Sequence, residues 1–239
     1  DNFLFIYWFF FNYKFIKMNN LTLIIPAKNE AESLPRVLDE LKEYKCKIDV
    51  ILHKSDIPTI EAIKNYNINI KYQNNYGYGD ALIYGISNCS TEHFCIFNAD
   101  GSFKPSELRR MYKELVDQDL DFIFGSRYQN NSGSEDDTFV TLVGNYIFTW
   151  IGKIFFKLNI SDILYTYVIG KTMSANKLEL TQRDFSLCVE IPIKAVRNNM
   201  KISSISSYER RRIAGVKKVK AFKDGLLILV HMIKLFFNK

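Results

Sequence analysis

Residues 95–102, Cys-Ile-Phe-Asn-Ala-Asp-Gly-Ser, contain the change from an apolar run to a polar turn on which the fold prediction rests. The run that begins at His93 predicts a buried strand, which ends before Asn98. Lys-Pro-Ser-Glu at 104–107 predicts the start of a helix, because proline and acidic residues are favoured in a first turn. Open α/β sheets bind ligands at the carboxyl ends of their strands, so Asp100 is a candidate ligand-binding residue. Capping of the following helix is its alternative role.

Strands and helices are expected to alternate along the first half of the chain. The apolar run at residues 21–25 is continuous and rich in β-branched side chains, which is typical of a strand covered on both faces. Further strands are expected at residues 48–52, 68–72, 93–97 and 121–125, with helices at residues 32–44, 58–66, 81–87 and 106–117. This alternation predicts an α/β fold with a doubly wound, mainly parallel sheet in a single domain.

Three segments are distinguished along the 239 residues. Residues 1–17 are apolar but too short to span a bilayer. They are interpreted either as an interfacial anchor or as sequence upstream of a start at Met18, and we favour the second and exclude them from the fold. Residues 18–224 are expected to form the main domain, and residues 225–239 a C-terminal apolar, amphipathic helix. The polar stretch 129–138 predicts a mobile loop.

Two late apolar stretches contain lysines that a full membrane span tolerates poorly. Residues 139–158 predict a helix that includes Lys153 and Lys157, and residues 225–237 predict a shorter one. Each helix is expected to lie either on the protein core or on a bilayer surface. The sequence leaves these two placements open.

Positive charge is concentrated late in the chain. The formal net charge is +6, and seven Lys and Arg residues lie within residues 210–223. Such a cluster suits phosphates or an anionic membrane surface, with a solvated charged face as the alternative. Aromatic side chains do not alternate with these cations at a stacking spacing, which argues against nucleic-acid binding. The four cysteines form no Cys-x-x-Cys pair, so we expect reduced thiols in a cytosolic protein, without a zinc site.

Six short motifs follow one another along residues 21–224. They are Ile-Ile-Pro-Ala-Lys-Asn-Glu at 24–30, Asn-x-Gly-x-Gly-x-Ala at 75–81, Asn-Ala-Asp at 98–100, Gly-Ser-Arg-Tyr at 125–128, the acidic Glu190 in a helical stretch, and Arg-x-x-Gly-x-Lys-Lys at 212–218. Together and in this order they resemble the inverting glycosyltransferases of family 2, and within that family the polyprenyl-phosphate (dolichol-phosphate mannose synthase-like) branch.

The resemblance implies a Rossmann-like, nucleotide-binding domain of the GT-A type. It also implies a nucleoside-diphosphate sugar as donor, Mg²⁺ or Mn²⁺ as cofactor, and a membrane-linked acceptor, foremost a polyprenyl phosphate. Peripheral contact with the cytosolic face of a membrane is expected through the basic cluster and the apolar helices.

The resemblance assigns charged roles to individual residues. Asp100 is expected to ligate the metal, with the Asn98 amide as a neutral second ligand, because hard divalent cations prefer oxygen. A metal held there would neutralise the leaving pyrophosphate. Arg127, Arg212 and Lys218 are expected to add positive charge at the same place. A structural ion pair is the alternative for Arg127, and a surface charge is the alternative for Arg212.

The first motif and the glycine turn are expected to bind the nucleotide. Asn29 and Glu30 would orient its base or ribose, unless they cap a helix. Gly79 would permit a tight turn beside the ligand, although a plain loop uses glycine as readily. The predicted nucleotide-binding set is completed by Pro26, Ala27, Lys28 and Ala99.

The acceptor determines whether a catalytic base is needed. A polyprenyl phosphate is already ionised near neutral pH, whereas a hydroxyl acceptor needs a carboxylate within hydrogen-bond reach. Glu190 is the candidate base and joins Asp100 and Arg127 in the predicted catalytic set. A paired, buried glutamate is the alternative interpretation of Glu190.

Three departures from the family pattern favour a second hypothesis. Asn98 stands where the family has aspartate, and Leu-His-Lys-Ser-Asp at 52–56 stands in place of Val-Asp-Asp-Gly-Ser. Tyr78 and Asp80 replace commoner basic or small residues. A non-catalytic nucleotide-sugar-binding or scaffolding module of the same fold is therefore the alternative to an enzyme.

Overall fold

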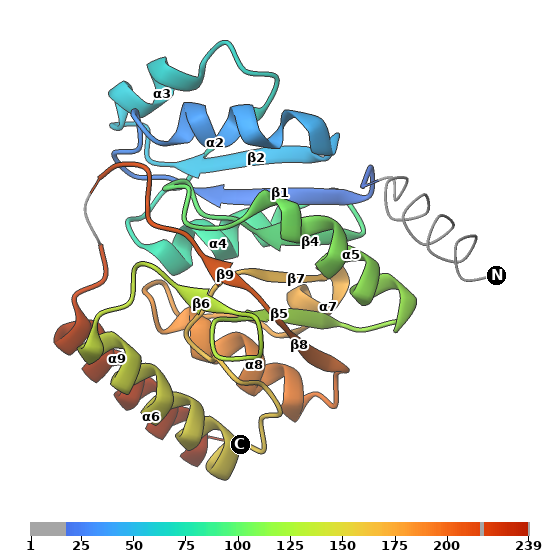
Figure 1. The fold of residues 1–239 in the computed structure, drawn as a ribbon, viewed down its shortest axis with the longest axis vertical. Coiled ribbons are helices and arrows are strands. Elements are labelled where there is room, and N and C mark those ends of the chain that lie inside the picture. The colour runs from blue at the N-terminus through green and yellow to red at the C-terminus, as the bar shows by residue number, and fades with distance from the viewer. Residues whose placement is uncertain (1–17, 216–217, 239) are drawn as a thin grey trace.

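The computed structural model describes residues 18–215 and 218–238, so the expectations for residues 1–17 lie outside the described residues. Its main strands are β1 (Leu21–Pro26), β2 (Lys47–Leu52), β3 (Asn69–Tyr72), β4 (His93–Ile96), β5 (Phe122–Ser126), β7 (Val168–Lys171) and β8 (Ile202–Ser206). They form one seven-stranded sheet in the order β3-β2-β1-β4-β7-β5-β8 (Figure 1). A separate two-stranded sheet pairs β6 (Gly133–Ser134) with β9 (Tyr208–Glu209).

The strands of the main sheet pair in parallel except at β7. β1 is parallel to β2 and β4, β2 to β3, and β5 to β8, while β7 is antiparallel to both β4 and β5. The expected mainly parallel sheet is therefore confirmed. The sequence analysis missed β7 and β8, because a short apolar run does not reveal the strand direction or the neighbour that it will find.

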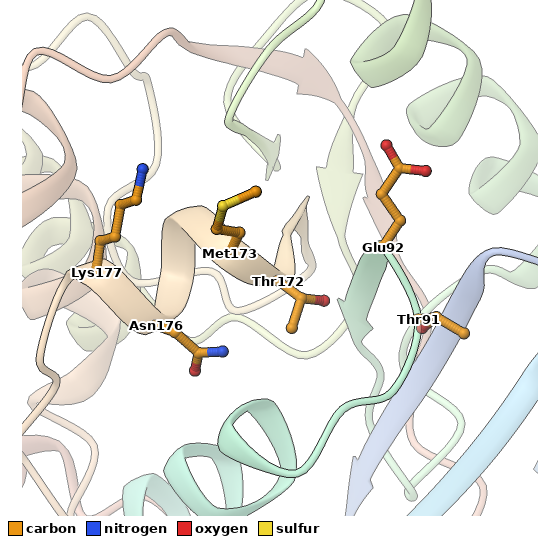
Figure 2. A pocket seen from close by; sticks show the side chains of 6 residues that line it. All are labelled: Thr91, Glu92, Thr172, Met173, Asn176 and Lys177. Carbon is orange, nitrogen blue, oxygen red and sulfur yellow. The ribbon is translucent and has the colours of Figure 1, made fainter.

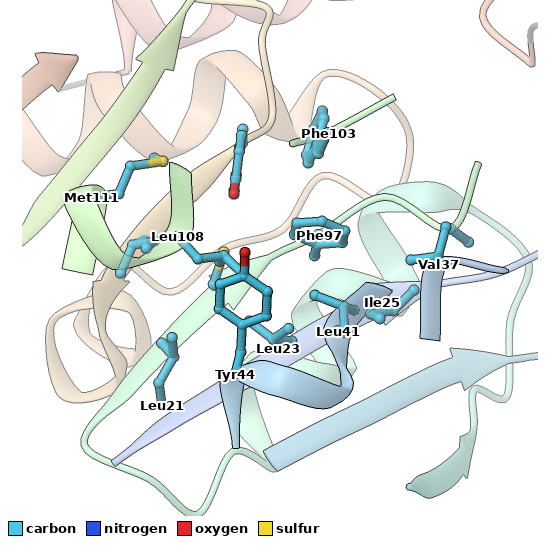
Figure 3. Close-up of a cluster of buried hydrophobic side chains, with 14 of the residues drawn as sticks. Leu21, Leu23, Ile25, Val37, Leu41, Tyr44, Phe97, Phe103, Leu108 and Met111 are labelled. Atoms are coloured by element: carbon cyan, nitrogen blue, oxygen red, sulfur yellow. The ribbon is translucent and has the colours of Figure 1, made fainter. Parts of the chain in front are cut away.

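Helices cover both faces of the sheet. They are α2 (Leu34–Leu41), α3 (Ile57–Ile63), α4 (Tyr78–Ser87), α5 (Leu108–Asp117), α6 (Phe139–Phe156), α7 (Thr172–Lys177), α8 (Leu187–Arg197) and α9 (Ala221–Phe237). Leu23 and Ile25 of β1 pack with α2, α3 and α5 in one apolar core (Figure 3), whereas Ile24 packs with α4, α7 and α8 in the other. All three side chains are fully buried, as the continuous apolar run predicted for a strand covered on both faces.

The helices α6 and α9 form an outer layer beyond the sheet. Phe156 of α6 and Met232 of α9 join the core that contains α8, and the two helices lie side by side in Figure 1. α9 begins at Ala221, four residues before the predicted start. The reason is Asp224, whose carboxylate accepts a hydrogen bond from the backbone N–H of Lys220 at 2.7 Å and so satisfies a donor at the helix start.

The polar stretch 129–138 is ordered, which corrects the prediction of a mobile loop. Its residues 133–134 form β6, and Glu135 accepts hydrogen bonds from the Tyr208 hydroxyl and the Arg211 backbone. Asp136 pairs with Arg212, and Asp137 accepts a hydrogen bond from the Tyr128 hydroxyl. Glu135 and Asp136 therefore find partners more than seventy residues later in the chain, which local sequence does not show.

The cysteines are free thiols, as predicted. Burial raises the pKa of Cys46 and of Cys188 to about 12, and it raises the pKa of Cys95 as well. These thiols are consequently poor nucleophiles near neutral pH.

Two buried histidines should make the stability of the fold depend on pH. Nδ1 of His93 and Nε2 of His231 have no hydrogen-bond partner within the described part of the chain, and burial lowers the pKa of both rings. As the pH falls, the two histidines therefore take up protons at a higher pH in the unfolded chain than in the folded protein. Their neutral burial leaves the free energy of unfolding undiminished above about pH 6.5 and lowers it as the pH drops below that value. We expect His231→Leu to flatten this fall in urea titrations between about pH 7 and pH 5. An unchanged pH slope in the variant would contradict the role of the ring.

Candidate functional site

Four of the predicted motifs meet at one edge of the sheet. The motifs at 24–30, 98–100 and 125–128 lie at the carboxyl ends of β1, β4 and β5. The late basic loop reaches the same edge, because the backbone N–H of Ile213 donates to the Asp100 carbonyl at 2.8 Å. Ligands of open α/β sheets bind at this edge.

The turn after β4 holds the Asp100 carboxylate in place. Oδ1 accepts hydrogen bonds from the backbone N–H of Ser102 at 3.0 Å and from its hydroxyl at 2.7 Å. Oδ2 lies 3.8 Å from Nη1 of Arg212, and the Asp100 side chain is 18% exposed. Asp100 caps no helix, since Lys104 and Glu107 occupy the two following cap positions. Within the described part of the chain, Oδ2 is therefore engaged by the Arg212 ion pair alone.

Asn98 supports Asp100 indirectly. Its Nδ2 donates to the Ser102 hydroxyl at 3.3 Å, and that hydroxyl donates to Asp100. Its Oδ1 lies 3.4 Å from the buried hydroxyl of Tyr78, which also donates to Thr166 at 2.8 Å. Asn98 is thus part of a hydrogen-bond chain that leads to Asp100, and the sequence analysis did not anticipate this positioning role.

Arg212 connects two acids across the site. Its Nη2 lies 2.6 Å from Oδ2 of Asp136, and its Nη1 faces Asp100. The side chain is only 18% exposed, which argues against its alternative interpretation as a surface charge. Gly101 permits this approach, because it has a φ of 82° and a Cβ there would lie 2.4 Å from the side chain of Ile213.

Glu30 joins the first motif to the same late loop. It is buried, accepts a hydrogen bond from the Ser33 hydroxyl at 2.5 Å and forms an ion pair with Lys218. Its neighbour Asn29 has a φ of 55° and donates its backbone N–H to Asp56 at 2.7 Å. Lys218 therefore pairs with Glu30 of the first motif, and Arg212 lies beside Asp100 of the third.

The remaining residues of the predicted nucleotide-binding set differ in whether their side chains are buried or exposed. Ala27 and Ala99 have buried side chains in the core, so only their backbones can face a ligand. Lys28 is exposed, and Pro26 is the last residue of β1.

The glycine turn before α4 accommodates protein backbone. A Cβ at Gly79 would lie 2.2 Å from the carbonyl oxygen of Gln182, and one at Gly77, whose φ is 143°, would lie 2.1 Å from that of Arg183. The backbone N–H of Asp80 also donates to Arg183 at 3.1 Å. These glycines therefore admit the 182–184 segment, a packing role that the sequence analysis did not weigh.

Glu190 binds the backbone at residues 181–182, next to this segment. Its fully buried carboxylate accepts hydrogen bonds from the backbone N–H groups of Thr181 and Gln182 and from the Thr181 hydroxyl, at 2.9–3.1 Å. Lys194 lies 2.8 Å from Oε1. Although burial opposes the charge, Lys194 and these donors lower the pKa of Glu190. The arrangement favours a paired, buried glutamate over a catalytic base.

Replacing Glu190 by glutamine tests this positioning role. We expect the free energy of unfolding to fall by about 1–3 kcal/mol, because charged hydrogen bonds to Lys194 and the 181–182 backbone are lost. Urea denaturation measures the effect. A fall in kcat with unchanged stability and a lost acidic limb in the pH–rate profile would instead identify a base.

Arg127 lies in a buried ion-pair network. Its Nε and Nη2 contact the two oxygens of Asp162 at 2.7 and 3.1 Å, and its Nη1 lies 3.1 Å from Glu209. The Asp162 side chain is fully buried. The nearby carboxylates hold the pKa of Arg127 well above its usual value. This geometry corresponds to the structural interpretation, and Asp162 and Glu209 are partners that the sequence analysis missed.

Comparison with known proteins identifies the family. The model of the family described as Glycosyl transferase family 2 matches residues 22–182, more than half of the chain. The chain belongs to glycosyl transferase family 2. It is thus a glycosyltransferase, and its six motifs lie on the scaffold that the resemblance implied.

Curated relatives of this transferase are distant. An uncharacterized glycosyltransferase of Mycobacterium tuberculosis is 23% identical over 211 residues, which cover 88% of this chain and 94% of the relative. The UDP-N-acetylglucosamine–dolichyl-phosphate N-acetylglucosaminyltransferase of Methanococcus voltae is 23% identical over 208 residues, with 77% and 82% coverage.

Solved structures confirm the GT-A fold of the transferase. Glucosyl-3-phosphoglycerate synthase from M. tuberculosis in complex with UDP superposes with a TM-score of 0.71 and 11% identity, covering 90% of this chain and 79% of that one. The same synthase with Mn²⁺, UDP and glucosyl-3-phosphoglycerate gives a TM-score of 0.69 at 9% identity. At this identity the likeness concerns the fold alone.

The site of the transferase fits a divalent metal that the substrate helps to hold. No group of three or more His, Cys, Asp or Glu suited to a metal occurs among residues 18–215 and 218–238. The partly exposed Asp100 carboxylate nevertheless keeps Oδ2 outside the Ser102 hydrogen bonds, and Mg²⁺ is commonly bound through one or two carboxylates together with substrate phosphates. Asp100 is therefore the residue that fits the metal, and the Asn98 amide is engaged with Ser102 and Tyr78.

An aromatic pair lies at the carboxyl end of β2, the strand that pairs with β1. His53, directly after β2, and Tyr76, in the turn before α4, stack with ring centroids 4.2 Å apart. Tyr76 is 65% exposed. The stack therefore involves the 52–56 segment, in which His53 occupies a position where the family pattern has an acid.

An open depression of about 530 Å³ lies away from this site (Figure 2). Its lining residues are Thr91, Glu92, Thr172, Met173, Asn176 and Lys177. Two of them precede β4, so the depression is at the amino end of the strand whose carboxyl end carries Asp100. None of the predicted site residues lines it.

Proposed function

We propose that this glycosyltransferase moves a sugar from a nucleoside diphosphate to a membrane-linked phosphate acceptor, foremost a polyprenyl phosphate, with inversion at the anomeric carbon. The observation that carries the proposal is the partly exposed Asp100 carboxylate beside Arg212 at the carboxyl edge of the sheet. A carboxylate and a guanidinium at one point suit a diphosphate with its cation.

The reaction requires the diphosphate leaving group to be stabilised as the glycosidic bond breaks. Bound Mg²⁺ or Mn²⁺ would supply Lewis-acid stabilisation there, with Asp100 as its protein ligand. Ser102 fixes the orientation of this carboxylate through two hydrogen bonds. Arg212 and Lys218, both on the late loop, would add positive charge beside the diphosphate while Asp136 and Glu30 remain their partners.

The pairing of the acids around the edge supports a phosphate acceptor. Glu30 is held by Ser33 and Lys218, Asp136 by Arg212, and Glu190 lies buried under the 181–182 segment. A hydroxyl acceptor would need one of these groups as a base, whereas a phosphate acceptor is already ionised and attacks without one. The dolichyl-phosphate substrate in the name of the M. voltae relative has the same chemistry.

The His53–Tyr76 stack is proposed as the platform for the nucleobase. The exposed ring of Tyr76 offers a flat surface at the carboxyl edge of β2. We expect Tyr76→Ala to weaken nucleoside diphosphate binding roughly 10- to 100-fold, since base–aromatic stacking contributes about 1–3 kcal/mol. Isothermal titration measures the affinity, and Tyr146→Ala, at an exposed tyrosine of α6, is the matched control. Equal affinities for the two variants would refute the platform.

A transfer assay tests the proposed function. The full chain is incubated with labelled nucleoside-diphosphate sugars and either polyprenyl phosphate or 3-phosphoglycerate, with Mn²⁺ or with a chelator. We expect metal-dependent label in the lipid extract only with polyprenyl phosphate. Label on the soluble acceptor would overturn the acceptor class, and nucleotide binding without turnover would support the non-catalytic module.

The proposed acceptor implies a place for the reaction. A polyprenyl phosphate resides in a bilayer, so the transferase would work at the cytosolic face of a membrane as a peripheral protein. Its +6 charge suits an anionic surface.

A further inference from the structure

Most of the large apolar side chains that are exposed in the described part of the chain lie on the outer faces of α6 and α9. Of the 21 large apolar side chains exposed within residues 18–215 and 218–238, eight lie on α6 and seven on α9. Phe139 is 80% exposed, Trp150 60% and Phe222 85%. Apolar patches of this size on a soluble surface mark interaction sites.

The burial pattern of α6 is the reverse of that of a water-facing helix. Asn145 and Thr149 are buried toward the protein, where Asn145 donates to the Tyr128 hydroxyl and Thr149 accepts from the backbone of Ile163. Phe and Trp side chains face outward instead. α9 buries Ile228, Met232 and Leu235 together with His231, yet it also exposes apolar side chains such as Leu226. The sequence of both helices therefore suits an apolar medium on the outer side.

The two helices run in the same direction and begin beside the site. Phe148 approaches Gly225 near the start of α9, and Phe155 contacts Phe236 near its end. Figure 1 shows both helices beginning on the side toward which the arrow of β1 points. α6 follows Asp136, the partner of Arg212, so the apolar layer starts next to the predicted phosphate-binding residues.

Lysines border the apolar layer and indicate its partner. Lys153, Lys223 and Lys234 are exposed on the two helices, whose one acid, Asp224, caps the start of α9. At 100° per residue, Lys223 and Lys234 fall on the same flank of α9. Pairing with a second copy would bring these cations together, whereas an anionic bilayer supplies both hydrocarbon and negative headgroups.

We propose that α6 and α9 together form a membrane-docking surface that lies in the plane of an anionic bilayer. The outer side chains enter the boundary between headgroups and acyl chains, with Trp150 and Tyr146 suited to that interface. An apolar cavity of about 200 Å³ between the helices, lined in part by Ile151, Met232 and Phe236, is open to an acyl-chain segment. The docking surface stands on these observations, and its use in presenting an acceptor rests on the proposed function.

Tryptophan fluorescence provides a site-specific test, because Trp8 and Trp150 are the two tryptophans of the chain. In a Trp8→Phe variant, Trp150 becomes the one indole reporter. We expect its emission to shift to the blue and to be quenched by chain-brominated lipids in phosphatidylcholine vesicles that contain phosphatidylglycerol. Flotation of the protein without a change in Trp150 emission would overturn the proposal, as would a vesicle-independent dimer that alone shifts the emission.

Charge variants complete the test without donor or acceptor, so the result is independent of catalysis. Lys223→Gln with Lys234→Gln should weaken partition onto the anionic vesicles roughly 30-fold, since each interfacial lysine contributes about fivefold. Lys42→Gln with Lys64→Gln has the same net charge and places its changes at the residues directly after α2 and α3, so its partition should decrease far less. Equal losses in the two double variants would contradict a specific docking face. Partition without turnover would refute the proposed function alone.

Discussion

Asp100→Asn should reduce sugar transfer by at least about 10³-fold while the fold stays intact. The amide keeps the shape of the side chain and can still accept the two hydrogen bonds from Ser102. It lacks the negative charge with which Asp100 would hold a divalent cation against a diphosphate in the proposed reaction. Metal stabilisation of a developing charge contributes several kcal/mol, and each 1.36 kcal/mol corresponds to about tenfold in rate.

Two measurements separate this loss from misfolding. Initial rates of transfer give the loss in turnover, and isothermal titration of nucleoside diphosphates with and without Mn²⁺ gives the metal-dependent part of binding. Asp117→Asn, at an exposed acid of α5, serves as the matched control and should retain both. If Asp100→Asn keeps metal-enhanced binding, the assignment of the ligand is wrong.

Arg127→Met should lower the free energy of unfolding by about 3–5 kcal/mol, the cost of leaving a buried charge without its partner. The Asp162 carboxylate is fully buried and receives two guanidinium contacts and the backbone N–H of Arg127. Burial raises the pKa of Glu209, and Arg127 opposes this rise. Without Arg127 the Glu209 carboxyl would favour protonation, so we expect the loss to be greater at pH 8 than at pH 5.

Chemical denaturation of single and double variants tests this network. Adding Asp162→Leu to Arg127→Met should recover part of the lost stability, because the unpaired buried charge is then removed. Arg127→Lys should recover little, since an ammonium cannot make the same two-pronged contact. A change of less than about 0.5 kcal/mol for Arg127→Met would place Arg127 with ordinary surface residues.

The composition of the site was only partly predictable. Glu30, Asp100, Arg212 and Lys218 were chosen from motifs, and the structure brings them to one edge. Asp136 was overlooked in a stretch taken for a mobile loop. A signal was present, because three consecutive acids at 135–137 are complementary to three arginines at 210–212.

The sequence by itself determined the alternation of strands and helices and the positions of the turns after β1 and β4. Those features depend on side-chain periodicity and turn chemistry within a few residues, which are local properties. Only the tertiary structure decided that β7 enters the sheet antiparallel, and that Glu190 and Arg127 are buried with their charges already paired. The role of a charged side chain depends on its solvation and its partners, and these partners come from distant parts of the chain.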